Sequence, residues 1–124
     1  MLSHFESIDK IKDNYDFILC ANVLSAIPCK STIYKIINEI GRLLKNDGEA
    51  IIVNQYKSSY FKKYETGIKH LHGYIYQNSR NAFYYGLLDE NIVSKICLDN
   101  NLAVIKSWSK AGSSYVVVGK NKHN

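Results

Sequence analysis

The sequence is poor in proline and contains no long apolar run. Pro28 is its single proline, which argues against long disordered linkers. No apolar stretch approaches the ~18–20 residues that a membrane-spanning helix needs. The amino-terminal residues mix charged and apolar side chains and lack the apolar core of a signal peptide. We therefore expect a cytoplasmic protein without a membrane partner, folded as a single domain over residues 1–124.

Cysteine is also scarce and widely spaced. The three cysteines are Cys20, Cys29 and Cys97, an odd number without the close pairs of zinc or redox motifs. We expect three reduced thiols, two of them packed as small apolar side chains, and no metal site.

Acidic residues are scarce in one segment. The protein has a formal net charge of +5. Residues 57–80 carry five basic side chains against Glu65 alone, a net charge of +4. The same segment holds two histidines and several tyrosines. Such a stretch can hold an anionic substrate or a nucleic acid, but charge runs are more often solvated surfaces, so nucleic-acid binding is the less favoured interpretation.

Hydrophobic periodicity predicts alternating helices and strands in the first half of the chain. Residues 3–12 have the apolar spacing of a short helix, and 15–20 form a continuous apolar run typical of a strand covered on both faces. Residues 31–45 carry one apolar stripe at helical spacing, with Ser31 or Thr32 as the expected cap. A second apolar strand follows at 49–55. This strand–helix–strand order predicts a parallel pair with a right-handed crossover.

The second half predicts one more helix and a hairpin. Residues 89–100 have helical spacing and begin at Asp89, a good cap. Two β-rich runs, 102–108 and 114–119, are joined closely enough for an antiparallel hairpin. Between the halves lies an insert, about 56–87. We expect it to contain a helix starting at Ser58 or Ser59, followed by a loop over 74–86.

Three stretches together resemble a known family. They are YDFILCANVLSAIP (15–28), LLKNDGEAIIV (43–53) and the final hairpin. In this order they resemble the carboxyl-terminal half of a class I S-adenosylmethionine (SAM)-dependent methyltransferase. The resemblance implies an α/β fold with a partial Rossmann-like methyltransferase sheet. Its strands would be the family's strands 4-5-7-6, the last two an antiparallel hairpin, with the helices mainly on one face.

The family's glycine-rich cofactor loop is absent from the sequence. No G-x-G-x-x-G or shortened form occurs, so we expect the first half of the domain to lie outside this chain. SAM would then bind only if that half is supplied. The first strand would also lie at an unprotected edge, with Ile18, Ile51 and Val53, or their alternating neighbours, exposed. We therefore expect a homo-oligomer or a complementary chain that carries strands 1–3.

Ligands of open α/β sheets bind beyond the carboxyl ends of the strands. By resemblance, Cys20, Ala21 and Asn22 would line the methionine part of the cofactor. The alternative for Asn22 is that it only caps the next turn. Four further residues are candidates for substrate binding: Gln55, Tyr56, Tyr60 and Tyr74. The tyrosines of the insert can equally be packing residues.

The catalytic group is unknown, with His70 and His72 as candidate general bases for a hydroxyl or carboxyl acceptor. Two surface histidines are the alternative. Asn22 is not followed by Pro-Pro-Tyr, which disfavours amine methylation by the family's rule. The favoured function is the carboxyl-terminal portion of a methyltransferase that acts on a small-molecule or other non-amine acceptor once another chain completes it. The alternative is an inactive remnant that serves as a binding module through the basic, Tyr-rich insert.

Overall fold

The computed structural model of the protein describes residues 14–57 and 59–121, except for the side chains of 59–61. The helix expected at 3–12 lies outside the described residues. A four-stranded mixed sheet has the order β1-β2-β7-β6. Its strands are β1 (Tyr15–Ala21), β2 (Leu44–Gln55), β6 (Leu102–Lys110) and β7 (Ser113–Lys120). β1 and β2 are parallel, and β7 is antiparallel to both of its neighbours. The predicted α/β fold and strand order are confirmed.

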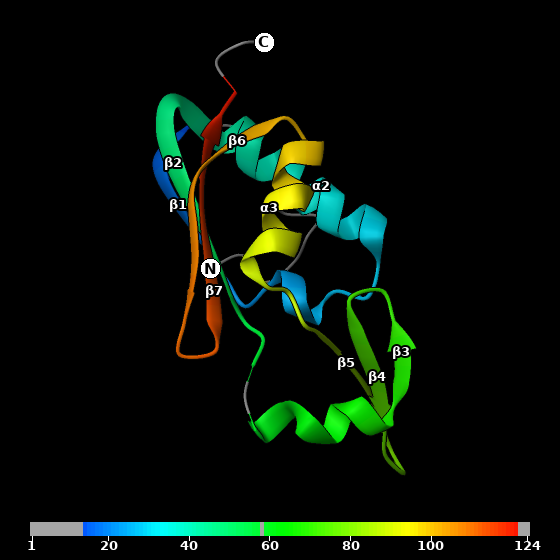
Figure 1. Ribbon diagram of the computed structural model, residues 1–124. Coiled ribbons are helices and arrows are strands. Elements are labelled where there is room, and N and C mark those ends of the chain that lie inside the picture. The colour runs from blue at the N-terminus through cyan, green and yellow to red at the C-terminus, as the bar shows by residue number, and fades with distance from the viewer. Residues whose placement is uncertain (1–13, 58, 122–124) are drawn as a thin grey trace.

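Two α-helices, α2 (Lys30–Leu43) and α3 (Glu90–Asp99), lie on the same side of the sheet (Figure 1). The stripe predicted for the first helix is buried, at Ile33, Ile36, Ile37, Ile40 and Leu43. The predicted caps were wrong for α2, because Cys29 is its N-cap and makes no side-chain capping bond. The predicted cap of α3 is confirmed, since the Asp89 carboxylate accepts the Ile92 N–H at 2.8 Å.

The strands bury alternate side chains beneath these helices. Ala50, Ile52, Val116 and Val118 are fully buried, as the two-residue period of a strand requires. Ile18 is half-buried and packs against this core, so Ile18 is not the exposed residue among the expected alternatives.

The other face of the sheet is apolar and open. Phe17 and Leu19 of β1 are each 61% exposed, and Ile105 is 54% exposed. Ile51, Val53 and Val117 on this face are half-buried. Trp108 and Tyr115 stack on it, with ring centroids 5.0 Å apart. The expected exposure on this face therefore falls on the neighbours Phe17 and Leu19.

The insert differs from its prediction. A 3-10 helix, η2 (Ser59–Thr66), replaces the longer helix, and the expected loop over 74–86 is a small sheet of β3 (Ile68–His70), β4 (Gly73–Gln77) and β5 (Ala82–Gly86). Its rings pack together, with Tyr64 5.4 Å from Tyr76 and 5.8 Å from Tyr85, measured between ring centroids. These contacts join η2 to β4 and β5. Between the strands, Tyr74 lies opposite Tyr85 and Tyr76 opposite Phe83. Cross-strand aromatic pairs stabilise a sheet without a clear alternating pattern, which is why periodicity missed it.

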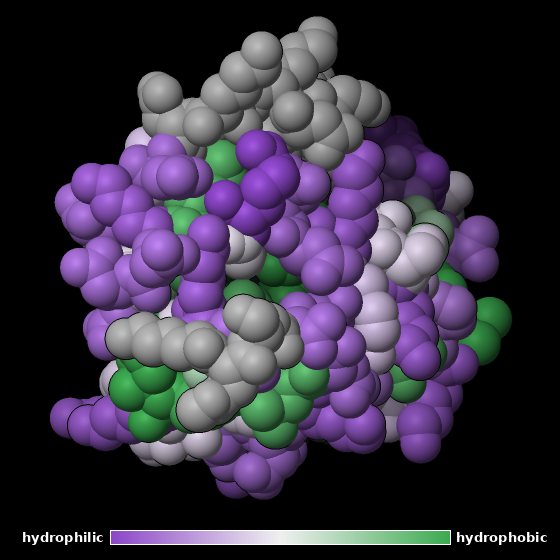
Figure 2. Space-filling view, turned by 90° about the horizontal axis from the view of Figure 1, so that it is seen from above, coloured by the Kyte–Doolittle hydropathy of each residue, from purple (hydrophilic) through white to green (hydrophobic). Residues whose placement is uncertain are grey.

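The sheet has two different ends. The insert lies at the end where β2 finishes (Figure 1). The end where β2 begins and β7 finishes is mostly hydrophilic, with apolar side chains gathered in small groups (Figure 2). No helix of the described ranges is long and apolar enough to cross a membrane.

Replacing Ile52 by alanine tests the core. Ile52 is fully buried in β2, so we expect Ile52→Ala to lower the free energy of unfolding by about 2–5 kcal/mol. The control is Ile68→Ala in β3, where the side chain is 70% exposed and the expected loss is below about 1 kcal/mol. Urea denaturation measures both, and equal losses would contradict the described core.

Candidate functional site

The carboxyl ends of β1 and β2 are joined by the side chain of Asn22. Its backbone N–H donates to Val53 O at 2.7 Å, and its Oδ1 accepts the Gln55 N–H at 2.9 Å. Asn22 adopts a positive φ of 59°, a conformation that asparagine tolerates better than most residues. The side chain therefore bridges the two strand ends. It does not cap the 3-10 helix η1 (Leu24–Ala26), whose N-cap Val23 makes no side-chain capping bond.

Asn54 lies at the candidate site and was missed by the sequence reasoning. Its side chain is fully buried, and its Oδ1 accepts the Ser25 N–H at 3.3 Å, which ties η1 to β2. Its Nδ2 has no hydrogen-bond partner among the described residues. A buried donor of this kind costs about 1–3 kcal/mol. The signal in the sequence was a polar residue at a position where the strand alternation predicts an apolar one.

Gln55 and Tyr56 are fixed mainly through their backbones. The Tyr85 hydroxyl donates to Gln55 O, which links the insert to the end of β2. The N–H groups of Tyr56 and Lys57 donate to Gly112 O at 2.9 and 3.0 Å. Gly112 has a φ of 80° and lies against Lys57 O, so the hairpin turn accepts only glycine here.

The candidate cofactor residues differ in whether their side chains are buried or exposed. Cys20 is 7% exposed, and burial raises the pKa of its thiol to about 11, so the thiol stays protonated within the core. Ala21 and Asn22 are exposed. Of the substrate candidates, Tyr56 and Tyr74 are half-buried, and the Tyr56 hydroxyl donates to Ser109 Oγ at 3.3 Å. The Tyr60 side chain lies outside the description.

The two candidate histidines occupy separate positions. The His70 Nε2 lies 2.7 Å from Pro28 O, an acceptor, and its ring meets Tyr84 edge-on. His72 lines a cavity between α2 and α3. Burial, together with the nearby Lys30 charge, lowers the pKa of His72. The structure does not bring the two rings together at the strand ends.

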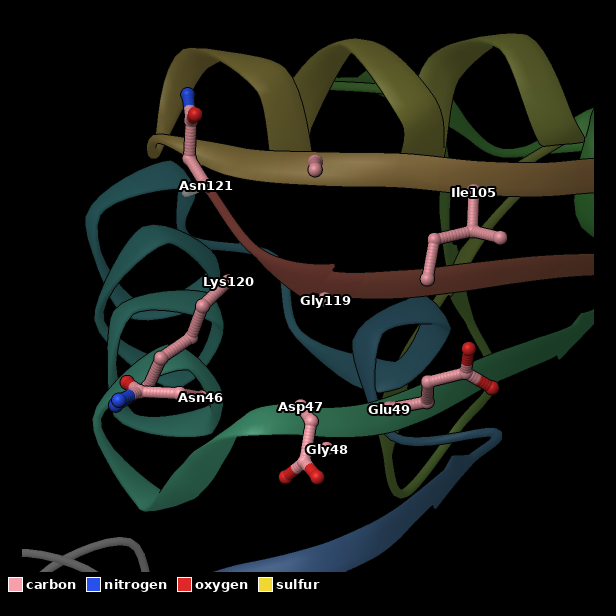
Figure 3. A pocket seen from close by; sticks show the side chains of 9 residues that line it. Asn46, Asp47, Gly48, Glu49, Ile105, Gly119, Lys120 and Asn121 are labelled. Carbon is pink, nitrogen blue, oxygen red and sulfur yellow. The ribbon is translucent and has the colours of Figure 1, made fainter. Parts of the chain in front are cut away.

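A second hollow lies at the opposite end of β2. It has a volume of about 300 Å³ and is lined partly by Asp47, Glu49, Ile105 and Lys120. The carboxylates of Asp47 and Glu49 do not converge (Figure 3). Across the described ranges, no group of three or more histidine, cysteine or acidic side chains is arranged to hold a metal ion.

Comparison with solved structures gives the class of fold. The chain superimposes on a SAM-dependent methyltransferase from Methanosarcina mazei with a TM-score of 0.66, at 15% identity, over 91% of this chain and 64% of that one. A SAM-dependent methyltransferase from Clostridium acetobutylicum gives a TM-score of 0.62 at 13% identity, over 89% of this chain and 60% of that one. A putative type 11 methyltransferase from Sulfolobus solfataricus gives a TM-score of 0.54 at 26% identity, over 98% of this chain and 57% of that one. The chain thus has the Rossmann-like fold of SAM-dependent methyltransferases.

A closer likeness in sequence is to the uncharacterized protein YmfD of Escherichia coli K12. The two are 68% identical over 115 residues, which covers 93% of this chain and 52% of YmfD. The chain therefore spans about half the length of this relative. No family model matches the sequence.

Substitutions of Asn22 separate its two contributions to the strand ends. Asn22→Ala loses the Gln55 bond and places alanine at positive φ, so we expect a loss of about 1–3 kcal/mol in the free energy of unfolding. Asn22→Gly loses only the bond, for about 0.5–1.5 kcal/mol. Urea denaturation measures both. A smaller loss of unfolding free energy for Asn22→Ala than for Asn22→Gly would contradict the positive φ of Asn22.

Alkylation distinguishes the three thiols. Cys29 is exposed, and hydrogen bonds with Ser31 and Thr32 lower its pKa to about 7. Burial raises the pKa of Cys97 to about 12, with the nearby Cys20 adding to the shift. We expect iodoacetamide to label Cys29 first in the folded protein, at a rate that rises through pH 7 and levels off near pH 8, because only the thiolate reacts. Peptide mapping by mass spectrometry measures this. A rate that still climbs steeply between pH 8 and 9 would contradict it.

Proposed function

We propose that the chain supplies the carboxyl-terminal portion of a SAM-dependent methyltransferase whose glycine-rich cofactor loop comes from other polypeptide sequence. The observation that carries the proposal is the strand order β1-β2-β7-β6, with an antiparallel last strand between its neighbours. The likeness covers only 57–64% of the three methyltransferases compared. The remainder of such a domain would hold the other side of the cofactor.

The described strand ends are proposed to hold one side of SAM. Ala21 and Asn22 are exposed there, and the Asn22 amide keeps its NH2 donors after its oxygen has accepted the Gln55 N–H. Cys20 contributes backbone, since its side chain is buried. Among the described residues, no glycine-rich turn joins a strand of the main sheet to a helix. SAM, when bound, supplies an electrophilic methyl group. The residues of this chain would position the cofactor and the acceptor.

The acceptor is proposed to be a small molecule or another non-amine group. Gln55, Tyr56, Tyr60 and Tyr74 are the residues proposed to bind it, because they follow β2 or belong to the insert beside its end. For a hydroxyl or carboxyl acceptor, His70 or His72 would take the proton. The cytoplasmic location stays a prediction.

The open apolar face supports the proposed partner. β1 has β2 as its single neighbour in the described sheet, so its other edge has no partner strand among the described residues, and such an edge can pair with another chain. Phe17 and Leu19 are each 61% exposed on the face opposite the helices. Exposed apolar patches mark interaction sites. The proposed occupant is a complementary segment that carries strands 1–3. A second copy of this chain is the other candidate.

The second candidate function is an inactive remnant that binds a partner through the insert. It is favoured by the exposure of the basic side chains Lys57, Lys62, Lys63, Lys69 and Arg80. The aromatic rings beside them, Tyr64, Tyr76 and Tyr85, pack against one another, which favours a charged surface over base stacking.

Calorimetry with SAM tests the primary function. We expect no binding to the 124-residue chain alone. Full-length YmfD, or this chain co-expressed with the part of YmfD outside the matched region, should bind. Binding to the chain alone would contradict the need for a second segment. A folded full-length YmfD without SAM binding would favour the inactive remnant.

Two matched leucine substitutions test the open face. Leu19→Lys places a charge on that face, whereas Leu98→Lys does so on α3, where the leucine is 58% exposed. We expect Leu19→Lys to reduce the binding of a hydrophobic dye and to prevent the chain from assembling with its partner, whether the complementary segment or a second copy, as measured by light scattering. Leu98→Lys should leave dye binding and assembly unchanged. Equal behaviour of the two variants, or a stable wild-type monomer that binds no dye, would overturn the proposed interface.

A further inference from the structure

A cavity of about 240 Å³ lies between the two α-helices and the turn that joins β3 to β4. Its lining residues are Lys30, Ile33 and Tyr34 of α2, Leu71 and His72 of the turn, and Ile92, Lys95, Ile96 and Asp99 of α3. Its volume equals that of about eight liquid waters at ~30 Å³ each. A ligand of this size has on the order of ten non-hydrogen atoms.

The floor of the cavity is apolar and well ordered by packing. Ile33 and Ile96 are 2% and 5% exposed and belong to the core. Leu71 and Ile92 pack against that core. Leu71 holds a positive φ of 53°, a strained conformation for a leucine, and this turn places it among the lining residues. Four aliphatic side chains thus offer contact to a hydrocarbon group.

The rim carries one positive charge that forms no ion pair with a carboxylate of the described residues, although, after the hydrogen bond from Lys95, that charge also helps to lower the pKa of Asp99. Asp99 is the one acid among the lining residues, and it accepts hydrogen bonds from Lys95 Nζ at 3.3 and 3.2 Å and from the Tyr34 hydroxyl at 3.2 Å. Lys30 forms no ion pair within the described ranges. Its ammonium lies 5.3 Å from the centroid of the Tyr34 ring.

His72 adds a polar group beside this charge. Burial and the Lys30 charge lower the pKa of His72, against the opposing effect of Asp89, which favours the neutral imidazole, and a neutral imidazole can donate one N–H. The rim therefore offers one cation and one neutral donor, a combination that suits a single negative charge.

We propose that this cavity binds a small amphipathic monoanion, an aromatic or aliphatic carboxylate of about the size of benzoate. The carboxylate lies between Lys30 and His72, and the hydrocarbon group contacts Ile33, Leu71, Ile92 and Ile96. The lining residues share no member with the strand-end residues Ala21, Asn22 and Asn54. His72 is also one of the two histidines proposed to take the acceptor's proton, so the experiment measures ligand binding and not methyl transfer.

Three probes separate the contributions of charge and hydrocarbon. Benzoate carries both, acetate carries the charge alone, and benzyl alcohol carries the ring alone. We expect saturable benzoate binding to the 124-residue chain, detected by chemical-shift perturbation at the cavity residues, and at least about tenfold weaker binding of the other two. Absence of saturable benzoate binding overturns the proposal. If acetate binds as tightly as benzoate, the apolar floor does not contribute to binding, and the proposal is wrong. If benzyl alcohol binds as tightly as benzoate, the Lys30 cation does not contribute, and the proposal is wrong.

Four variants test the assignment of the rim. Lys30→Gln should weaken benzoate binding about tenfold, which is 1.4 kcal/mol, and Lys30→Arg should retain most of it. Asp99→Asn should strengthen it, since it removes the one lining acid. The control Lys69→Gln alters an exposed lysine of β3 outside the cavity and should change nothing. Equal loss in Lys30→Gln and Lys69→Gln, or weaker binding in Asp99→Asn, would overturn the assignment. Circular dichroism confirms that each variant is folded, and should Lys30→Gln not fold, the Asp99→Asn result decides.

Discussion

The pairing of β2 on both of its edges is the constraint on which the rest of the structure depends. This strand lies parallel to β1 on one side and antiparallel to β7 on the other. Ala50, Ile52 and Asn54 point from it into the buried layer. Because the strand is fixed on both edges, its last residues hold a defined position. Asn22 and the hairpin turn at Gly112 then attach to those residues through hydrogen bonds.

The two faces of the sheet account for the two kinds of recognition proposed. The helix side is closed over a core, and the cavity between α2 and α3 is what remains open in that layer. The opposite side leaves Phe17 and Leu19 exposed beside an edge strand. A small ligand suits the cavity on the helix side, since aliphatic side chains and one cation surround a confined volume. A folded partner suits the opposite side of the sheet, since that face is broad and apolar.

The main sheet was predictable because each of its elements has a strong local pattern. The α2 stripe and the apolar runs of β1 and β2 each match one period, and Asp89 caps α3 as expected. The insert was not predictable, because β4 and β5 place aromatic residues opposite one another in a register that no local pattern specifies. Of the candidate site, Asn22 and Gln55 were predicted from their places at strand ends. Asn54 was missed, since its burial and its bond to Ser25 depend on contacts distant in the sequence.

The sequence by itself determined the order of elements, the buried face of α2 and the basic character of the insert, since these follow from residue spacing and composition. The tertiary structure alone decided that Asn22 bridges two strands, that Cys20 faces the core while Leu19 faces outward, and that His72 lies beside Lys30. The physical reason is that a strand's register selects which alternate side chains are buried. Register is set by pairing between segments about thirty or more residues apart, such as Leu19 with Ile51 and Ile51 with Val117.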